Sequence, residues 1–103
     1  MKIYTNIFDL AKPTQNQFYV PKYSDFGIGI KVVRRGEDVD ADITLEADGQ
    51  TFEAEADKVG GFTIYDAASE GAGSVNYKVT CSGQIFHLTQ IVTDSAIFEK
   101  KKF

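Results

Sequence analysis

The stretch from Val75 to Val92 reads VNYKVTC, then SG, then QIFHLTQIV. Two runs rich in β-branched and aromatic residues flank Ser82-Gly83, and this pattern predicts a β-hairpin with a two-residue turn. Directly opposed residues share one face of a hairpin. The predicted register therefore gathers five side chains on one apolar face: Tyr77, Val79, Cys81, Phe86 and Leu88. We expect this face to form one wall of a β-sandwich core.

Further strand signals follow one another from residue 25 onward. Residues 26–32 alternate with a period of two, and Asp48-Gly49 predicts a second hairpin over residues 41–57. The inward pairs expected in that hairpin are Leu45–Phe52, Ile43–Ala54 and Ala41–Ala56. Another strand is expected around residues 62–66, and residues 97–103 either add a last strand or fray.

Together these signals give roughly seven short strands with a turn every 8–12 residues and no helix longer than a turn. The fold class predicted is all-β: an immunoglobulin-like antiparallel β-sandwich of about seven strands, with no disulfide and with an extended N-terminal segment. A small barrel is the alternative.

Residues 1–24 depart from this regular pattern. Residues 2–8 favour a strand with apolar groups on both faces, whereas residues 9–17 favour irregular structure. We interpret residues 1–24 as an N-terminal arm or edge strand, and residues 25–103 as the β-sandwich domain. Long connections in compact domains are uncommon and usually functional. We therefore expect the apolar residues of this segment to bind a protein partner: Ile3, Tyr4, Ile7, Phe8, Phe18 and Tyr19.

Length, composition and charge exclude several classes of protein. The 103 residues fit one domain, and 43% hydrophobic residues suffice for a packed core. The net charge of -4 argues against a nucleic-acid binder, which would show a basic face. A single cysteine cannot form an internal disulfide and fits a reducing compartment. The N-terminus has no uninterrupted apolar run, so neither a signal peptide nor a membrane span is expected.

The sequence predicts neither an enzyme nor a cofactor. Cys81 and His87, each the only residue of its type, lie on opposite faces of the predicted hairpin. They cannot form a nucleophile–base pair without breaking the hairpin. A zinc site needs several histidine or cysteine ligands, which are missing.

Carboxylates are concentrated in residues 37–57, which hold nine acidic residues and no lysine or arginine. Asp38, Asp40 and Asp42 resemble the start of a calcium loop, but the turn glycine and the glutamate at the twelfth position are missing. We predict no metal site and expect a solvated acidic face, which a cation or a basic partner would neutralise.

The region from Gly29 to Cys81 resembles small immunoglobulin-like modules found on tailed-phage particles. The resemblance rests on residues 34–39, on the strand-turn-strand over residues 43–54, and on residues 62–66. It implies a non-enzymatic structural or assembly role as a virion accessory component, in capsid decoration, a head fibre or a tail. The implied partners are other protein subunits, as a homo-oligomer or with capsid or tail proteins, on a virion assembled in the host cytoplasm.

Two other functions are considered beside this assembly role. The first is a carbohydrate-binding module, in which exposed aromatic rings would stack on a sugar; the candidates are Tyr4, Phe18, Tyr19, Tyr23, Tyr65 and Tyr77. The second is a small enzyme or inhibitor, which ranks last because the polar residues do not converge.

Overall fold

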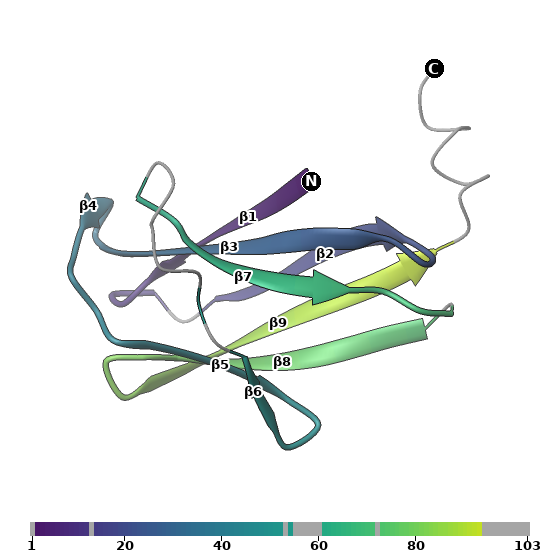
Figure 1. Cartoon of the computed structure of the whole chain (residues 1–103). Coiled ribbons are helices and arrows are strands. Elements are labelled where there is room, and N and C mark those ends of the chain that lie inside the picture. The colour runs from purple at the N-terminus through teal and green to yellow at the C-terminus, as the bar shows by residue number, and fades with distance from the viewer. Residues whose placement is uncertain (1, 13, 53, 55–60, 72, 94–103) are drawn as a thin grey trace.

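The structure, a computed structural model, describes residues 2–12, 14–52, 54, 61–71 and 73–93 (Figure 1). Over these residues the chain forms nine strands and no helix, so the prediction of an all-β fold is confirmed. The strands are β1 (Lys2–Asp9), β2 (Gln15–Pro21), β3 (Asp25–Arg34), β4 (Glu37–Asp38), β5 (Ile43–Ala47), β6 (Gln50–Phe52), β7 (Thr63–Ala68), β8 (Gly73–Cys81) and β9 (Gln84–Thr93). The possible tail strand at residues 97–103 lies outside the described residues.

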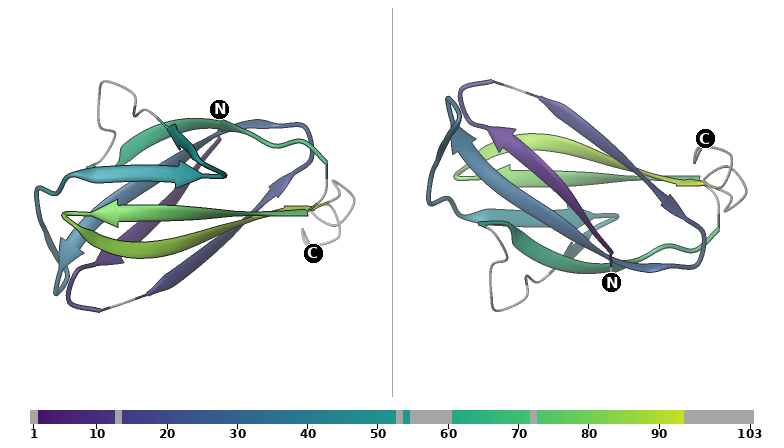
Figure 2. Two further views of the ribbon diagram at one scale, coloured as in Figure 1. Left: turned by 90° about the horizontal axis from the view of Figure 1, so that it is seen from below. Right: turned by 90° about the horizontal axis from the view of Figure 1, so that it is seen from above.

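Two sheets pack face to face and enclose the core (Figures 1 and 2). In sheet A, the central strand β3 has β1 on one side and β4 and β7 on the other. Sheet B has the order β2-β9-β8-β5-β6. The chain is thus a two-layered β structure without a disulfide, since its single cysteine, Cys81, is a buried free thiol.

Both sheets are mixed, so the prediction of a purely antiparallel sandwich is wrong. β1 pairs in parallel with β3 over its whole length, and β2 pairs in parallel with β9 over its whole length. Parallel strands require long connections, whereas antiparallel neighbours can be joined by tight turns. Only the tight turns leave a local signal in the sequence, and for this reason the two parallel pairs were not predicted.

The β8–β9 hairpin has the predicted register, with Tyr77 opposite Leu88 and Val79 opposite Phe86. Its turn has positive φ at both central residues, 50° at Ser82 and 86° at Gly83. This conformation matches the right-handed twist of the flanking strands, and glycine adopts it without a steric penalty. The five apolar residues predicted for the inward face are all buried, which confirms that this hairpin forms a wall of the core.

The β5–β6 hairpin is confirmed at its turn but is shorter than predicted. Leu45 lies opposite Phe52, as expected. Ala54, however, bridges to Tyr65 of β7 and does not continue the ladder opposite Ile43. At this point the backbone that follows β6 of sheet B is bridged to β7 of sheet A. The predicted Ala41–Ala56 pair lies outside the described residues.

Residues 2–21 are part of the sandwich rather than an arm reaching away from it. β1 is the outer strand of sheet A and β2 is the outer strand of sheet B. Phe8 and Phe18 belong to the same buried core as Phe86 and Leu88. The connection between the two strands is held by Asp9, whose Oδ1 accepts hydrogen bonds from the backbone N–H of Ala11 (2.8 Å) and Arg35 (2.9 Å). These hydrogen bonds to its charged form lower the pKa of Asp9.

Candidate functional site

The six residues predicted to bind a partner have different environments in the structure. Phe8 and Phe18 are buried in the chain's own core, where a partner cannot reach them. The physical reason is strand alternation: both lie on the faces of β1 and β2 that point between the sheets. Tyr4 is half-buried and stacks on Phe18, with ring centroids 5.3 Å apart.

The other three candidates lie outside the core. Ile3 is half-buried and packs close to Gly29 of β3. Ile7 is 53% exposed and Tyr19 is 40% exposed. These two side chains project from β1 and β2, so the structure leaves an apolar group available on each of the two strands.

We call the lateral surface formed by β1 and β2 the β1–β2 side. The two strands meet there, since Tyr4 contacts Phe18 and the side-chain amide Nδ2 of Asn16 donates to the carbonyl of Ile7 at 3.3 Å. β1 has eight residues and β2 has seven, and each is the last strand of its sheet. On the opposite side the outer strands are shorter, with six residues in β7, two in β4 and three in β6. The bridge from Ala54 to Tyr65 joins β7 there to the residues that follow β6. The β1–β2 side therefore presents the two longest outer strands of the sandwich.

The two sides also differ in charge. Three lysines and one acid lie within or next to β1 and β2, namely Lys2, Lys12, Lys22 and Asp9, so this side is net basic. The described acids of the 37–57 region lie on the opposite side, on β4, β5 and the loops beside them. Two of these acids are paired with bases from other strands, Asp38 with Lys31 at 3.1 Å and Glu46 with Lys78 at 3.6 Å.

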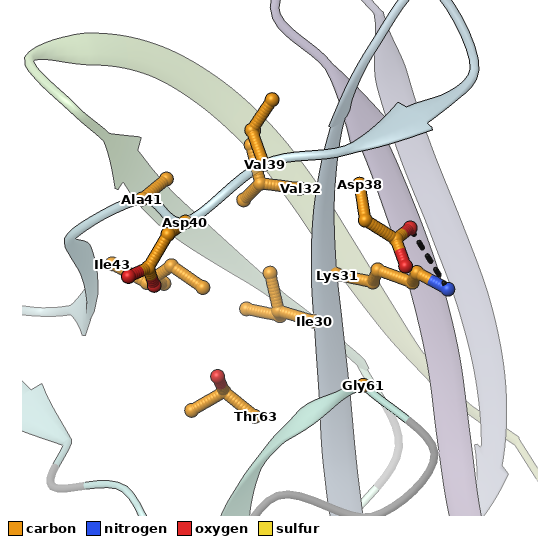
Figure 3. Close-up of a pocket in the computed structure, with 10 residues that line it drawn as sticks. All are labelled: Ile30, Lys31, Val32, Asp38, Val39, Asp40, Ala41, Ile43, Gly61 and Thr63. Atoms are coloured by element: carbon orange, nitrogen blue, oxygen red, sulfur yellow. Dashed lines mark ion pairs between the residues drawn. The ribbon is translucent and has the colours of Figure 1, made fainter.

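A cavity of about 270 Å³ lies between β3, the β4–β5 connection and the start of β7 (Figure 3). Ile30, Val32 and Ile43 give it an apolar lining, and the Lys31–Asp38 ion pair lies beside it. Ligand sites usually span about 300–1,000 Å³, so this volume lies just below the usual range. We interpret it as a packing gap at one end of the sandwich.

The calcium-loop resemblance of residues 38–42 does not correspond to a cluster of ligands. Asp38 and Asp40 line the cavity of Figure 3, whereas the backbone carbonyl of Asp42 accepts a hydrogen bond from Ser82 in the β8–β9 turn. Among the described residues, no group of three histidine, cysteine, aspartate or glutamate side chains is placed to hold a metal ion.

A second cavity, of about 550 Å³, opens at the other end of the sandwich. It lies between the β5–β6 turn, the end of β7 and the start of β8. Tyr77 and Gln90 are the buried polar residues of its lining, and the Tyr77 hydroxyl donates to Gln90 Oε1 at 2.6 Å. Gln90 is not among the predicted site residues. Its inward position could have been recognised, because Gln90 follows Phe86 and Leu88 with a period of two on the inward face of β9.

Cys81 and His87 lie on opposite faces of the β8–β9 hairpin, as predicted. Cys81 is fully buried, and burial raises the pKa of its thiol to about 11. Such a thiol is protonated at neutral pH and is a poor nucleophile. His87 is exposed on the outer face of sheet B. No helix that could cross a membrane is found in the described part of the chain.

The tyrosines do not form a common exposed platform. Tyr65 and Tyr77 are buried, and Tyr4 is half-buried against Phe18. Tyr19 and Tyr23 are exposed, at 40% and 79%. Of the five tyrosines, therefore, only Tyr19 and Tyr23 are exposed to solvent.

No protein-family model matches the chain, and no curated protein matches it. Among solved structures, the chain is similar to a cysteine protease inhibitor from Entamoeba histolytica. The TM-score is 0.45 at 10% identity, over 88% of this chain and 97% of the inhibitor. It is also similar to a chain of a heme-copper terminal oxidase dimer. There the TM-score is 0.47 at 16% identity, over 89% of this chain and 65% of the other. Both TM-scores are low, and we draw no conclusion from either likeness.

Proposed function

We propose that this chain is a non-enzymatic assembly protein that binds other protein subunits, including copies of itself, through its β1–β2 side. The observation that carries the proposal is the placement of two long edge strands, β1 and β2, on the same side of the sandwich. A long edge presents unpaired backbone N–H and C=O groups and serves as a template for pairing with another chain. Proteins that stay monomeric usually shorten or cover such edges. On its opposite side this chain has the short strands β4 and β6, and the six-residue β7 is partly covered by the bridge from Ala54 to Tyr65.

Side chains on these strands support a protein contact. Ile7 and Tyr19 are both exposed, and an apolar or aromatic anchor within a polar rim is typical of protein interfaces. The edge is partly capped, because Asn16 Nδ2 donates to the carbonyl of Ile7 and Asn6 Nδ2 donates to the carbonyl of Tyr4 at 3.2 Å. Such capping suits an edge that is stable alone and becomes fully paired only in an assembly.

The charges favour a head-to-tail arrangement of copies. The basic residues near β1 and β2 and the acidic residues near β4 and β5 lie on opposite sides of one molecule. A contact between unlike surfaces is heterologous, and it builds rings or filaments rather than isolated pairs. Charge complementarity would set the register of this contact and make it sensitive to salt.

The proposed location is a tailed-phage particle, where this chain would serve as a capsid-decoration, head-fibre or tail component of immunoglobulin-like fold. Support for this part comes from the resemblance of residues 29–81 to such modules. The all-β sandwich is compatible with the resemblance. The buried thiol of Cys81 and its separation from His87 support a non-enzymatic role.

The experiment compares two aspartate substitutions by sedimentation velocity over a range of protein and salt concentrations. Ile7→Asp places a negative charge on the β1–β2 side, where the acidic surface of the next copy would repel it. Ile85→Asp is the matched control, since Ile85 is 51% exposed against 53% for Ile7 but lies on the outer face of β9. We expect the wild-type chain and Ile85→Asp to associate at low salt, and Ile7→Asp to remain monomeric. Equal loss of association in both variants, or a wild-type monomer under all conditions, would contradict the proposal.

A further inference from the structure

The 550 Å³ cavity at the β5–β6 end of the sandwich is separate from the β1–β2 side and has the composition of a ligand site. Its volume lies within the roughly 300–1,000 Å³ of small-molecule sites. Phe52, Val75 and Tyr77 give it an apolar and aromatic wall, and the rings of Phe52 and Tyr77 lie 5.7 Å apart. Asp48 and Glu70 are exposed residues of the same lining.

Gln90 is the unusual residue of this lining, because its side-chain amide is only partly satisfied. The residue is 2% exposed, and its Oε1 accepts the hydrogen bond from Tyr77. Its Nε2 carries two N–H donors and makes no hydrogen bond to a described residue. Gln90 lines the cavity, so this side-chain amide lies at the cavity wall.

Buried polar groups nearly always have a hydrogen-bond partner, so these donors are expected to bind an acceptor oxygen in the cavity, from water or from a ligand that displaces it. The lining restricts which acceptor fits. Among the described residues it includes Asp48 and Glu70 and no lysine, arginine or histidine, so an anionic ligand would be repelled. A cationic ammonium group has no acceptor to offer to Gln90.

A neutral hydroxyl satisfies both requirements, since it accepts a hydrogen bond from an amide N–H and donates one to a carboxylate. We propose that this cavity binds a neutral saccharide. One sugar hydroxyl accepts from Gln90 Nε2, outer hydroxyls donate to Asp48 and Glu70, and the apolar face of the ring packs on Phe52 and Val75, which are half-buried. Apart from the buried Tyr77, this site shares no residue with the aromatic side chains that the sequence suggested for sugar binding, and it does not depend on the assembly role.

The test uses the isotope-labelled full chain in NMR titrations. The probes are glucose, galactose, mannose, N-acetylglucosamine, maltose and cellobiose, with the methylamide of Nα-acetyl-lysine as a cationic control. We expect at least one sugar to shift the side-chain NH₂ resonances of Gln90 and the backbone resonances of Asp48. We expect the lysine derivative to leave both unchanged.

Two variants locate the contact. Gln90→Met keeps the length of the side chain but removes the amide, and we expect it to weaken the sugar roughly tenfold or more. Asp48→Asn keeps a residue that tolerates positive φ in the turn, and we expect only a small loss because an amide oxygen still accepts from a hydroxyl. Ile85→Lys is the control outside the cavity and should bind as the wild type does.

Three outcomes would overturn the proposal: no resonance shift with any of the six sugars, binding of the lysine derivative in their place, or sugar binding that Gln90→Met leaves intact. If Gln90→Met does not fold, the Gln90 NH₂ shifts in the wild-type chain and the response of Asp48→Asn decide the question.

Discussion

Replacing Phe8 with alanine tests whether the N-terminal strand belongs to the core. Phe8 is fully buried in β1, and its ring centroid lies 5.1 Å from that of Phe86 in β9. The substitution removes a buried ring and leaves a cavity between the two sheets. Such Phe→Ala changes cost about 3–5 kcal/mol. This is a large share of the roughly 5–15 kcal/mol by which a domain of this size is stable.

The measurement is urea and thermal unfolding followed by circular dichroism and tyrosine fluorescence. A loss of 3 kcal/mol or more corresponds to a fall in Tm of at least about 12 °C, at roughly 4–8 °C per kcal/mol. Ile7→Ala is the matched control, because Ile7 is the neighbouring residue of the same strand and is 53% exposed. We expect it to change the free energy of unfolding by no more than about 1 kcal/mol.

A double variant measures the interaction between Phe8 and Phe86 directly. Phe8→Ala combined with Phe86→Ala should show a coupling free energy of about 0.5–1.5 kcal/mol, since the two rings are in contact. The reasoning is refuted if Phe8→Ala is as mild as Ile7→Ala. In that case β1 does not dock on the core, and the alternative of an N-terminal arm regains support.

Two further predictions concern alkaline pH and the packing of β1 on β3. Burial raises the pKa of Tyr77 from 10.0 to about 12 and that of Cys81 from 9.0 to about 11. Both groups hold their protons more tightly when folded, so their contribution to stability is complete below pH 9 and is lost as the pH rises towards 12. Urea midpoints should fall over this window, less steeply in Tyr77→Phe, and a flat profile would contradict the burial. A Cβ at Gly29 would lie 3.3 Å from Ile3 Cγ2 and 3.4 Å from Ile64 Cδ1. Gly29→Val should therefore lower the free energy of unfolding by about 1–3 kcal/mol, and an unchanged urea midpoint would show that this packing is loose.

The candidate sites show which kinds of functional residue can be recognised from the sequence. The apolar residues of the first 24 positions were identified as a group, but their roles were not separated. β1 carries apolar residues on both faces, so the alternation along its sequence does not indicate which face points into the core. The structure turns Phe8 into the core and leaves Ile7 exposed. Gln90 could not be recognised as a site residue from the sequence, because the role of a polar residue on an inward face depends on its neighbours in space.

Local sequence by itself determined the all-β class, the β8–β9 register and the β5–β6 turn. These features depend on side chains and turn residues that are close together along the chain, and the two-residue turns leave few alternative registers. Only the tertiary structure decided the parallel placement of β1 and β2, the open β1–β2 side, and the cavity that joins Asp48, Tyr77 and Gln90. Each of these brings together segments that are distant along the chain. Such pairings are selected by burial and packing of the whole molecule, and no local pattern encodes them.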